Sequence, residues 1–278
     1  MKILFTTDLH GNDKYYFSIL KAARENHVDM VINGADMLPK TGNPFVKQQR
    51  FIQHLGKRYF PSFEKEKIHY LCCLGNDDIR IFDQEFDDIC SRFEYVHNIP
   101  QRKIEIDGLE FIGFNLVKDY RFELKDRCRM DTINTEFPKQ NGPGCLSTKN
   151  KGWQDFENWP LYAKGIPTIE DELENLVKPN DMKKAVYVMH QPPSGIGLDV
   201  REDDGEVGSA AVHDFLSKEQ PFLALHGHIH NSFRNTGIWK AKIRETICIQ
   251  PGQGSNFDPL PIYVLIDTKT MEMRRLGN

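Results

Sequence analysis

Residues 2–23 carry the stretch KILFTTDLHGNDKYYFSILKAA, which decides the fold. Its first five residues form a short, mostly apolar run that ends in a polar loop. Helical spacing then relates Tyr16, Ile19, Leu20 and Ala23. The stretch therefore predicts a buried strand, a polar loop and a helix, in that order.

The same order recurs further along the chain. Apolar runs predict strands at residues 30–33 and 69–74, and helical spacing predicts helices at 46–59 and 79–90. Alternating strands and helices are typical of βαβ units, whose helices cover a largely parallel and buried sheet.

A hairpin and several later strands complete the predicted architecture. Residues 102–106 and 109–114 flank the pair Asp107-Gly108, which suits a type I′ turn and makes the sheet mixed. Further strands are expected at 185–189, 222–226, 247–250 and 262–267, and a helix at 209–219 with Ser209 as its N-cap. This count predicts an α/β fold, a two-sheet mixed β sandwich flanked by helices.

Residues 1–278 are predicted to form a single domain, because no flexible linker or internal repeat divides them. Residues 117–167 lack clear periodicity and are expected to be an inserted surface region. Two interpretations of this insertion remain open. It is either a lid or binding element over the functional site, or an excursion packed by its own aromatic residues.

Composition excludes several classes of protein. The net charge of -4, with 27% charged residues, disfavours a general nucleic-acid surface, which needs clustered Lys and Arg. No window approaches the roughly 20 apolar residues of a membrane span, and no signal peptide is apparent. The six cysteines lack Cys-x-x-Cys spacing. We expect a cytoplasmic protein with reduced thiols and no membrane partner.

Side chains with metal-donor atoms follow the expected strands. These seven are Asp8, His10, Asp36, Asn76, His190, His228 and His230. In open α/β sheets the carboxyl ends of the strands converge on the ligand crevice, so the seven are expected to meet there. A lone histidine is usually structural, and only the complete set supports a metal site.

These residues resemble the motifs of the calcineurin-like metallophosphoesterase family, in particular its small prokaryotic branch. The matching pieces are Asp8-Leu9-His10, Gly34-Ala35-Asp36, Gly75-Asn76-Asp77-Asp78, His190 and Gly227-His228-Ile229-His230. The resemblance covers about the first 230 residues and implies the four-layer fold of that family. It departs from the family pattern at Ala35, which adds one residue between Gly34 and Asp36.

The resemblance also implies a ligand set for two divalent ions. Asp8, His10, Asp36 and His230 would hold one ion, and Asp36, Asn76, His190 and His228 would hold the other, with Asp36 as the bridge. Mixed imidazole and carboxylate donors suit Mn, Fe or Zn better than Mg or Ca. Mn is the first expectation, because it is common in the family.

The predicted function is hydrolysis of a phosphoester by a water that two metal ions activate. A phosphodiesterase acting on a nucleotide or another small phosphoester is favoured, and nucleic acid is disfavoured as a substrate. The predicted catalytic residues are Asp77, Asn76 and His190. The alternative is a non-catalytic, metal-binding interaction scaffold of the same fold. The sequence leaves the oligomeric state open.

Asp77 stands where the family commonly has a histidine that assists the leaving group. A carboxylate beside two cations is expected to have a lowered pKa and to be a poor proton donor. Esters with acidic leaving groups are therefore expected to react faster than alkyl monoesters. Arg127 and Arg129, in the insertion, have side chains that can bind phosphate. Surface arginines are common, so neither is assigned that role.

Overall fold

Two six-stranded sheets carry the fold, and each contains four parallel strands. The structure is a computed structural model that describes residues 1–254 and 258–277. The first sheet has the order β18-β17-β1-β2-β3-β4. Its strands are β1 (Lys2–Thr6), β2 (Met30–Asn33), β3 (His69–Cys72), β4 (Val96–Asn98), β17 (Tyr263–Asp267) and β18 (Met273–Leu276).

The second sheet has the order β15-β16-β14-β11-β6-β5. Its parallel strands are β6 (Leu109–Phe114), β11 (Ala185–Met189), β14 (Leu223–Leu225) and β16 (Thr246–Ile249). The antiparallel strands β5 (Lys103–Ile106) and β15 (Lys240–Ile243) form its edges. Asp107 and Gly108 join β5 to β6 with φ of 51° and 76°, as a type I′ turn requires.

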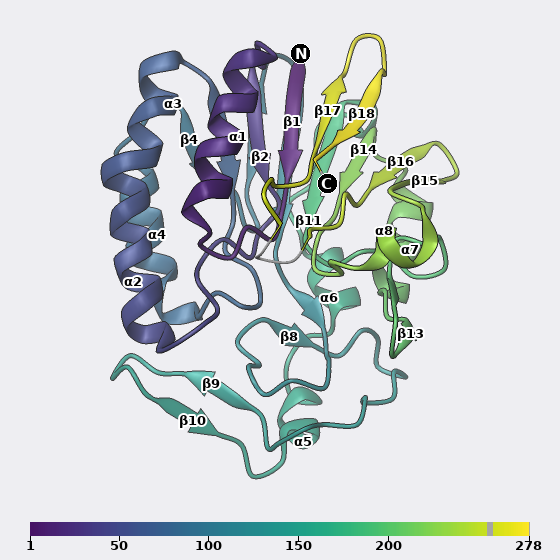
Figure 1. Cartoon of the computed structure of the whole chain (residues 1–278). Helices are drawn as coiled ribbons and strands as arrows, with labels where there is room; N and C mark the ends of the chain where they lie inside the picture. Colours follow the sequence, from purple (N-terminus) through teal and green to yellow (C-terminus); the bar gives the residue numbers. More distant parts are fainter. Residues whose placement is uncertain (255–257, 278) are drawn as a thin grey trace.

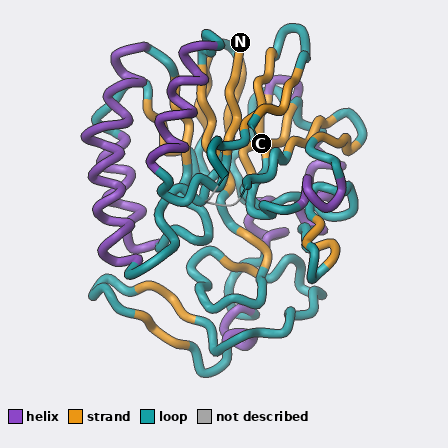
Figure 2. Tube along the Cα trace, in the orientation of Figure 1, coloured by secondary structure: helices purple, strands orange, loops and turns teal. Residues whose placement is uncertain are grey.

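Alternating side chains along the strands bury both faces of each sheet. In β1, Ile3 and Phe5 enter the cluster between the sheets, and Leu4 enters the cluster under the helices. The first sheet is covered by α1 (Asp13–Glu25), α2 (Pro44–His54), α3 (Phe60–Glu66) and α4 (Asp83–Cys90), which lie together in Figures 1 and 2. A π-helical segment, Leu55–Tyr59, joins α2 to α3, and a 3-10 turn, Arg80–Phe82, precedes α4.

Helices α6 (Ile169–Glu174) and α7 (Ala210–Glu219) cover the outer face of the second sheet. Ser209 caps α7, since its side chain accepts a hydrogen bond from Val212 N. The order helices, sheet, sheet, helices is the predicted four-layer α/β sandwich, which the structure confirms. A 3-10 turn, Met182–Lys184, leads into β11.

The insertion at 117–167 has short elements and a small core of its own. It contains β7 (Val117–Lys118), β8 (Cys128–Arg129), the hairpin β9 (Cys145–Ser147) and β10 (Trp153–Asp155), and α5 (Trp159–Ala163). Trp159 is buried in a cluster with Val117, Cys128, Met130 and Ala163. Figure 1 shows this region below the ends of β1 and β2 toward which their arrows point.

Further short elements frame the same end of the sheets. The hairpin β12 (Val200–Arg201) and β13 (Gly205–Glu206) follows β11, and α8 (Ser232–Thr236) follows β14. All six cysteines are free, as expected. Among the helices of the described residues, none has both the length and the apolar character needed to cross a membrane. The assignment of residues 1–278 to one domain stays a prediction.

Candidate metal centre

The seven predicted donor residues lie on loops that leave the carboxyl ends of five strands. Asp8 and His10 follow β1, Asp36 follows β2 and Asn76 follows β3. From the second sheet, His190 follows β11, and His228 and His230 follow β14. The site is therefore built where the two sheets face each other, as the location of ligand crevices in α/β folds leads one to expect.

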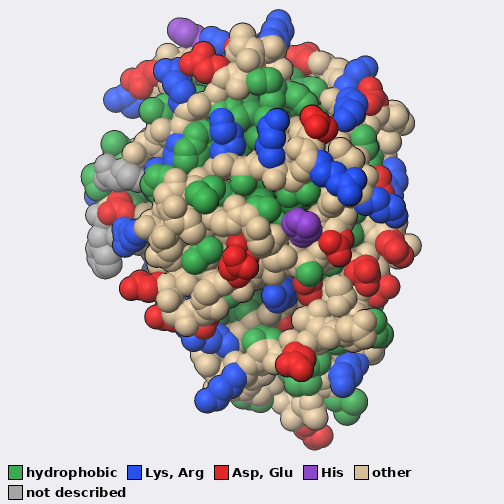
Figure 3. Space-filling model, turned by 90° about the vertical axis from the view of Figure 1, so that its right-hand side faces the viewer, with side chains coloured by type: hydrophobic (Ala, Val, Ile, Leu, Met, Phe, Trp, Pro, Cys, Tyr) green, Lys and Arg blue, Asp and Glu red, His purple; other side chains and the backbone are tan. Residues whose placement is uncertain are grey.

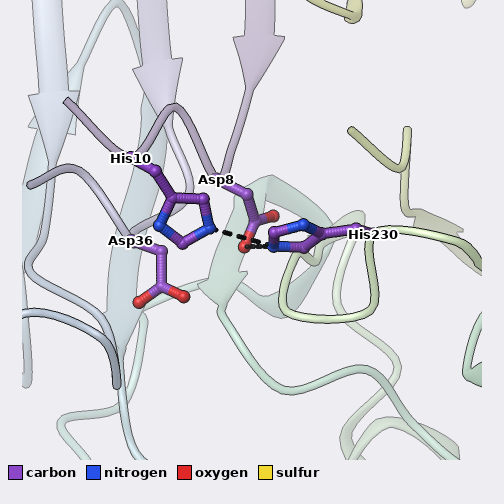
Figure 4. A group of neighbouring side chains, drawn as sticks. All are labelled: Asp8, His10, Asp36 and His230. Carbon is purple, nitrogen blue, oxygen red and sulfur yellow. Dashed lines mark hydrogen bonds and ion pairs between the residues drawn. The ribbon is translucent and has the colours of Figure 1, made fainter. Parts of the chain in front are cut away.

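One group of donors comprises Asp8, His10, Asp36 and His230 (Figure 4). One ligand atom from each residue can be chosen so that all four lie within 4.8 Å of one another. His10 Nε2 lies 3.0 Å from His230 Nε2, and His230 Nε2 lies 3.3 Å from Asp8 Oδ1. Two imidazoles and two carboxylates thus converge on one small volume.

A second group comprises Asp36, His190 and His228, whose ligand atoms also lie within 4.8 Å of one another. His190 Nε2 is 3.4 Å from Asp36 Oδ2 and 3.0 Å from Asn76 Oδ1. Asp36 belongs to both groups. The arrangement is that of two adjacent donor sets with one shared carboxylate.

The backbone at four of the donor residues has a left-handed conformation, with φ of 57° at Asp8, 42° at His10, 50° at Asp36 and 69° at His228. Such conformations are uncommon for residues other than glycine and often occur at functional sites. Ala35 also has a positive φ, 91°. With Ala35 and Asp36 both in this conformation, the loop accommodates Ala35, the residue that the family pattern lacks between Gly34 and Asp36.

Two glycines allow the donor loops to approach each other closely. A Cβ atom on Gly75 would lie 2.2 Å from Asp36 Oδ1, and one on Gly227 would lie 2.8 Å from Asp8 Oδ2. His228 N lies 3.2 Å from both carboxylate oxygens of Asp8 and donates a hydrogen bond to them. Asp77 N donates to Asp36 Oδ1 at 2.9 Å. Both carboxylates are thus oriented by backbone N–H groups.

The protonation states of four donor residues suit metal binding. Burial raises the pKa of the Asp8 and Asp36 carboxyl groups, but charges and hydrogen bonds, mainly those of His230 at Asp8 and of His190 at Asp36, together lower it by more, so both pKa values lie below the ordinary range. Burial lowers the pKa of His10 and His228 to about 3. Ionised carboxylates and neutral imidazoles are the forms that bind metal ions.

His190 has the opposite shift. Burial lowers its pKa, but the charge of Asp36, their hydrogen bond and the charge of Asp8 raise it to about 9. The pair of carboxylates therefore favours a positive charge at this position. His190 Nδ1 donates to Gly34 O at 2.8 Å, which directs Nε2 toward the other donors. The donor set fits a divalent cation in each group, although it does not identify the metal.

Asp77 borders the donor groups together with Lys40. Lys40 Nζ lies 3.8 Å from Asp77 Oδ2 and 3.3 Å from His10 Nε2. Burial, followed by the charge of Asp36, raises the pKa of Asp77 to about 6, and the charge of Lys40 opposes this rise. The protein's own groups thus raise the pKa of Asp77, whereas two neighbouring cations are expected to lower it.

The donor groups open into a pocket of about 250 Å³, which we call the central pocket. Its lining includes Asp36, Asn76, Asp77 and His228, and also Lys40, Tyr120 and Arg201. Sequence reasoning did not assign a role to these last three. The sequence could have indicated Lys40, because it closely follows Asp36. Nothing in the sequence places Tyr120 or Arg201 beside the donor residues.

The loop that carries Asn76 is held by two buried charged residues. The Asp78 carboxylate accepts hydrogen bonds from Gly75 N at 2.7 Å and from Met37 N at 2.9 Å. Arg127 Nε donates to Gly75 O at 2.8 Å, and its guanidinium also pairs with Asp83. Arg129 pairs with Glu172. Neither Arg127 nor Arg129 lines the central pocket, so both have a structural role.

The fold and the paired donor groups define the protein as a metallophosphoesterase-like α/β protein. The family model for calcineurin-like phosphoesterases matches residues 1–232, and the chain belongs to that family. This confirms the resemblance seen in the sequence motifs. Membership of this family implies a phosphoester hydrolase, and the Asp and His groups of the site could hold divalent metal ions.

Solved structures share this fold at low sequence identity. One crystal structure has a TM-score of 0.61 and 14% identity, with 99% of this chain and 98% of that chain covered. TT1561 of Thermus thermophilus has a TM-score of 0.58 and 13% identity, with the same coverage. A comparison with curated proteins gave no match.

Proposed function

We propose that the protein is a binuclear metal-dependent phosphodiesterase that acts on a nucleotide or another small phosphoester. The observation that carries this proposal is the pair of donor groups that share Asp36. Asp8, His10, Asp36 and His230 would hold one ion, and Asp36, Asn76, His190 and His228 the other. Mn is the proposed metal, with Fe and Zn as alternatives.

Two such ions would supply a nucleophilic water and bind the non-bridging oxygens of the phosphoryl group. Lys40 and Arg201 line the same pocket and offer cationic donors to those oxygens. Asn76 and His190 are proposed catalytic residues, because their side chains meet at 3.0 Å beside Asp36. Asp77 would transfer a proton to the leaving group, inefficiently if nearby cations lower its pKa.

The surface supports a small substrate rather than a long nucleic acid. Lys and Arg side chains are interspersed with Asp and Glu on the face that Figure 3 shows. A nucleic-acid groove needs a continuous basic stripe, and the net charge of -4 does not favour one. The cationic groups beside the donor residues, Lys40 and Arg201, are local.

The experiment measures metal content and hydrolysis in the same preparations. The protein is loaded with Mn, Zn or Fe, and the rates with bis(4-nitrophenyl) phosphate and 4-nitrophenyl phosphate are compared. We expect Mn-dependent turnover that favours the diester. Asp36→Asn should lose metal and activity together, whereas Asp87→Asn, which changes a carboxylate paired with Arg102, should retain both.

Two outcomes would contradict the proposal. Full activity of metal-stripped Asp36→Asn would remove the metals from the reaction. A wild-type protein that binds two ions but hydrolyses neither ester would favour the alternative, a metal-binding scaffold of the same fold.

A further inference from the structure

A second pocket, of about 600 Å³, lies beside the central pocket, and we call it the side pocket. The two share Tyr120, Arg201, His228 and Ile229 in their linings. The remaining walls come mostly from the insertion and from the β12–β13 hairpin. A volume of this size is within the range of about 300–1,000 Å³ that holds small organic ligands.

Aromatic rings lead from the donor residues to the junction of the two pockets, where Tyr120 lines both pockets and Phe122 lines the central pocket. The ring centroids of His228 and Tyr120 are 5.8 Å apart, and those of Tyr120 and Phe122 are also 5.8 Å apart. Tyr120 is fixed in place, because its hydroxyl donates to Leu124 O at 2.8 Å and Lys125 Nζ lies 5.0 Å from its ring centroid. The first part of this aromatic wall is therefore rigid.

Phe122, which ends the wall, is 46% exposed although it is large and apolar. The guanidinium carbons of Arg121 and Arg201 lie 5.5 and 5.6 Å from its ring centroid. Both arginines pair with Asp204, at 3.3 and 3.4 Å. This cluster joins the insertion to the β12–β13 hairpin and presents a ring and a guanidinium plane, both of which suit planar groups.

The charges that line the side pocket balance. Four basic and four acidic side chains border it, and the acidic Asp204 is paired with both arginines of the cluster. A second phosphate group would therefore find little net attraction there, whereas an uncharged ring system would find aromatic and guanidinium surfaces.

We propose that an uncharged, planar organic group of the phosphoester binds at the junction of the two pockets, against Phe122, which lines the central pocket, and Arg201, which lines both, and that these two residues determine this specificity. The proposal rests on the proposed function, because it takes the phosphoryl group to lie in the central pocket. Arg201 lines both pockets and would contact the phosphoryl group and the planar group together.

The test compares two non-chromogenic diesters, diphenyl phosphate and dimethyl phosphate, which carry the same charge. Their binding to the Mn-loaded protein is measured by calorimetry, and their competition with bis(4-nitrophenyl) phosphate hydrolysis is measured separately. We expect diphenyl phosphate to bind about tenfold or more tightly than dimethyl phosphate, from stacking of the phenyl groups.

Variants then locate the preference. Phe122→Leu and Arg201→Met should each reduce the ratio of the two dissociation constants by about fivefold. The matched controls are Phe17→Leu, whose ring is similarly exposed at 44%, and Arg274→Met, whose guanidinium pairs with Glu272. Both controls lie outside the two pockets and should keep the wild-type ratio.

Equal binding of the two diesters, or a ratio that neither Phe122→Leu nor Arg201→Met changes, would overturn the assignment of the planar group to the junction of the two pockets. Failure of the proposed function is distinguishable from this result. It would appear as absent hydrolysis of bis(4-nitrophenyl) phosphate by the wild type, while calorimetry would still report whether the phenyl preference exists.

Discussion

Replacing Gly75 by alanine should displace the shared carboxylate of the metal centre. The new Cβ would lie 2.2 Å from Asp36 Oδ1 and 2.5 Å from Asp36 N. Ordinary contacts of a carbon atom are about 3.5 Å, so Asp36 or the Gly75 loop must move by about 1 Å. Overpacking of this kind costs about 1–3 kcal/mol of the free energy of unfolding. A misplacement of about 1 Å in a catalytic site costs about 100-fold in rate.

The assay measures kcat/KM for bis(4-nitrophenyl) phosphate, Mn affinity by calorimetry and the thermal unfolding midpoint. Gly152→Ala is the control, because the nearest atom to its new Cβ would be Thr148 Oγ1 at 3.8 Å. We expect Gly75→Ala to be folded, less stable and about 100-fold slower. If it bound Mn and turned over as the wild type does, the position of Asp36 would not control the reaction, and the reasoning would be refuted.

Three other substitutions test separate parts of the structure. Asp77→His should raise the rate with alkyl monoesters relative to aryl diesters by about tenfold or more, and unchanged relative rates would exclude Asp77 from leaving-group chemistry. Burial, followed by the charge of His69, lowers the pKa of His97 from 6.5 to about 4, so the unfolded chain binds this proton first as the pH falls. The contribution of neutral His97 to stability is therefore fully present above about pH 6.5 and decreases toward about pH 4. Urea titrations should show that His97→Gln removes about 2 kcal/mol of this loss of stability at low pH. This magnitude is smaller than the pKa shift alone would give, because His97 is partly exposed to solvent. Arg127→Met should cost about 1–2 kcal/mol and weaken Mn binding, measured by melting with and without Mn, because it removes the donor to Gly75 O and frees the Gly75 loop, whereas Arg129→Met should leave Mn binding unchanged.

The central strands could be predicted from sequence because they are buried on both faces and appear as apolar runs. β4, β15 and β18 are not among the predicted strands, and each lies at the edge of its sheet. β4 has the sequence VHN, and β15, KAKI, carries an exposed lysine at two of its four positions. Edge strands need only one apolar face and are often charged, so their sequences carry little of the strand signal.

The donor residues were predictable for a related reason. Asp8 and Asp36 lie in the loops after β1 and β2 of the first sheet, and His190 directly follows β11 of the second sheet. All three strands were predictable, and the carboxyl ends of parallel strands in such folds converge on one crevice. Arg201 lies in a two-residue strand of a hairpin, and its side chain contacts Phe122 of the insertion and Asp204 in the turn of the same hairpin. Such contacts join segments 83 residues apart, as between Arg121 and Asp204, and leave no periodic pattern in the sequence.

The insertion illustrates why two interpretations of its sequence stayed open. Its core around Trp159 takes one or two residues from each of several short elements, too few to form a recognisable helical or alternating pattern. At the same time Tyr120 and Phe122 line the central pocket. The buried cluster and the residues that border the central pocket therefore lie in the same segment, and its role as a binding element stays a prediction.

The strained backbone of the donor loops indicates how the candidate metal centre keeps its shape. A left-handed residue other than glycine costs on the order of 1–3 kcal/mol, and such residues persist only where the surroundings impose them. Here main-chain hydrogen bonds join the first two loops, from Asp8 N to Ala35 O and from His10 N to Asp36 O, both at 3.0 Å. These bonds fix the backbone from which the donor side chains project. The free energy of metal binding therefore need not order the loops, and the site is preorganised by the same two sheets that form the core.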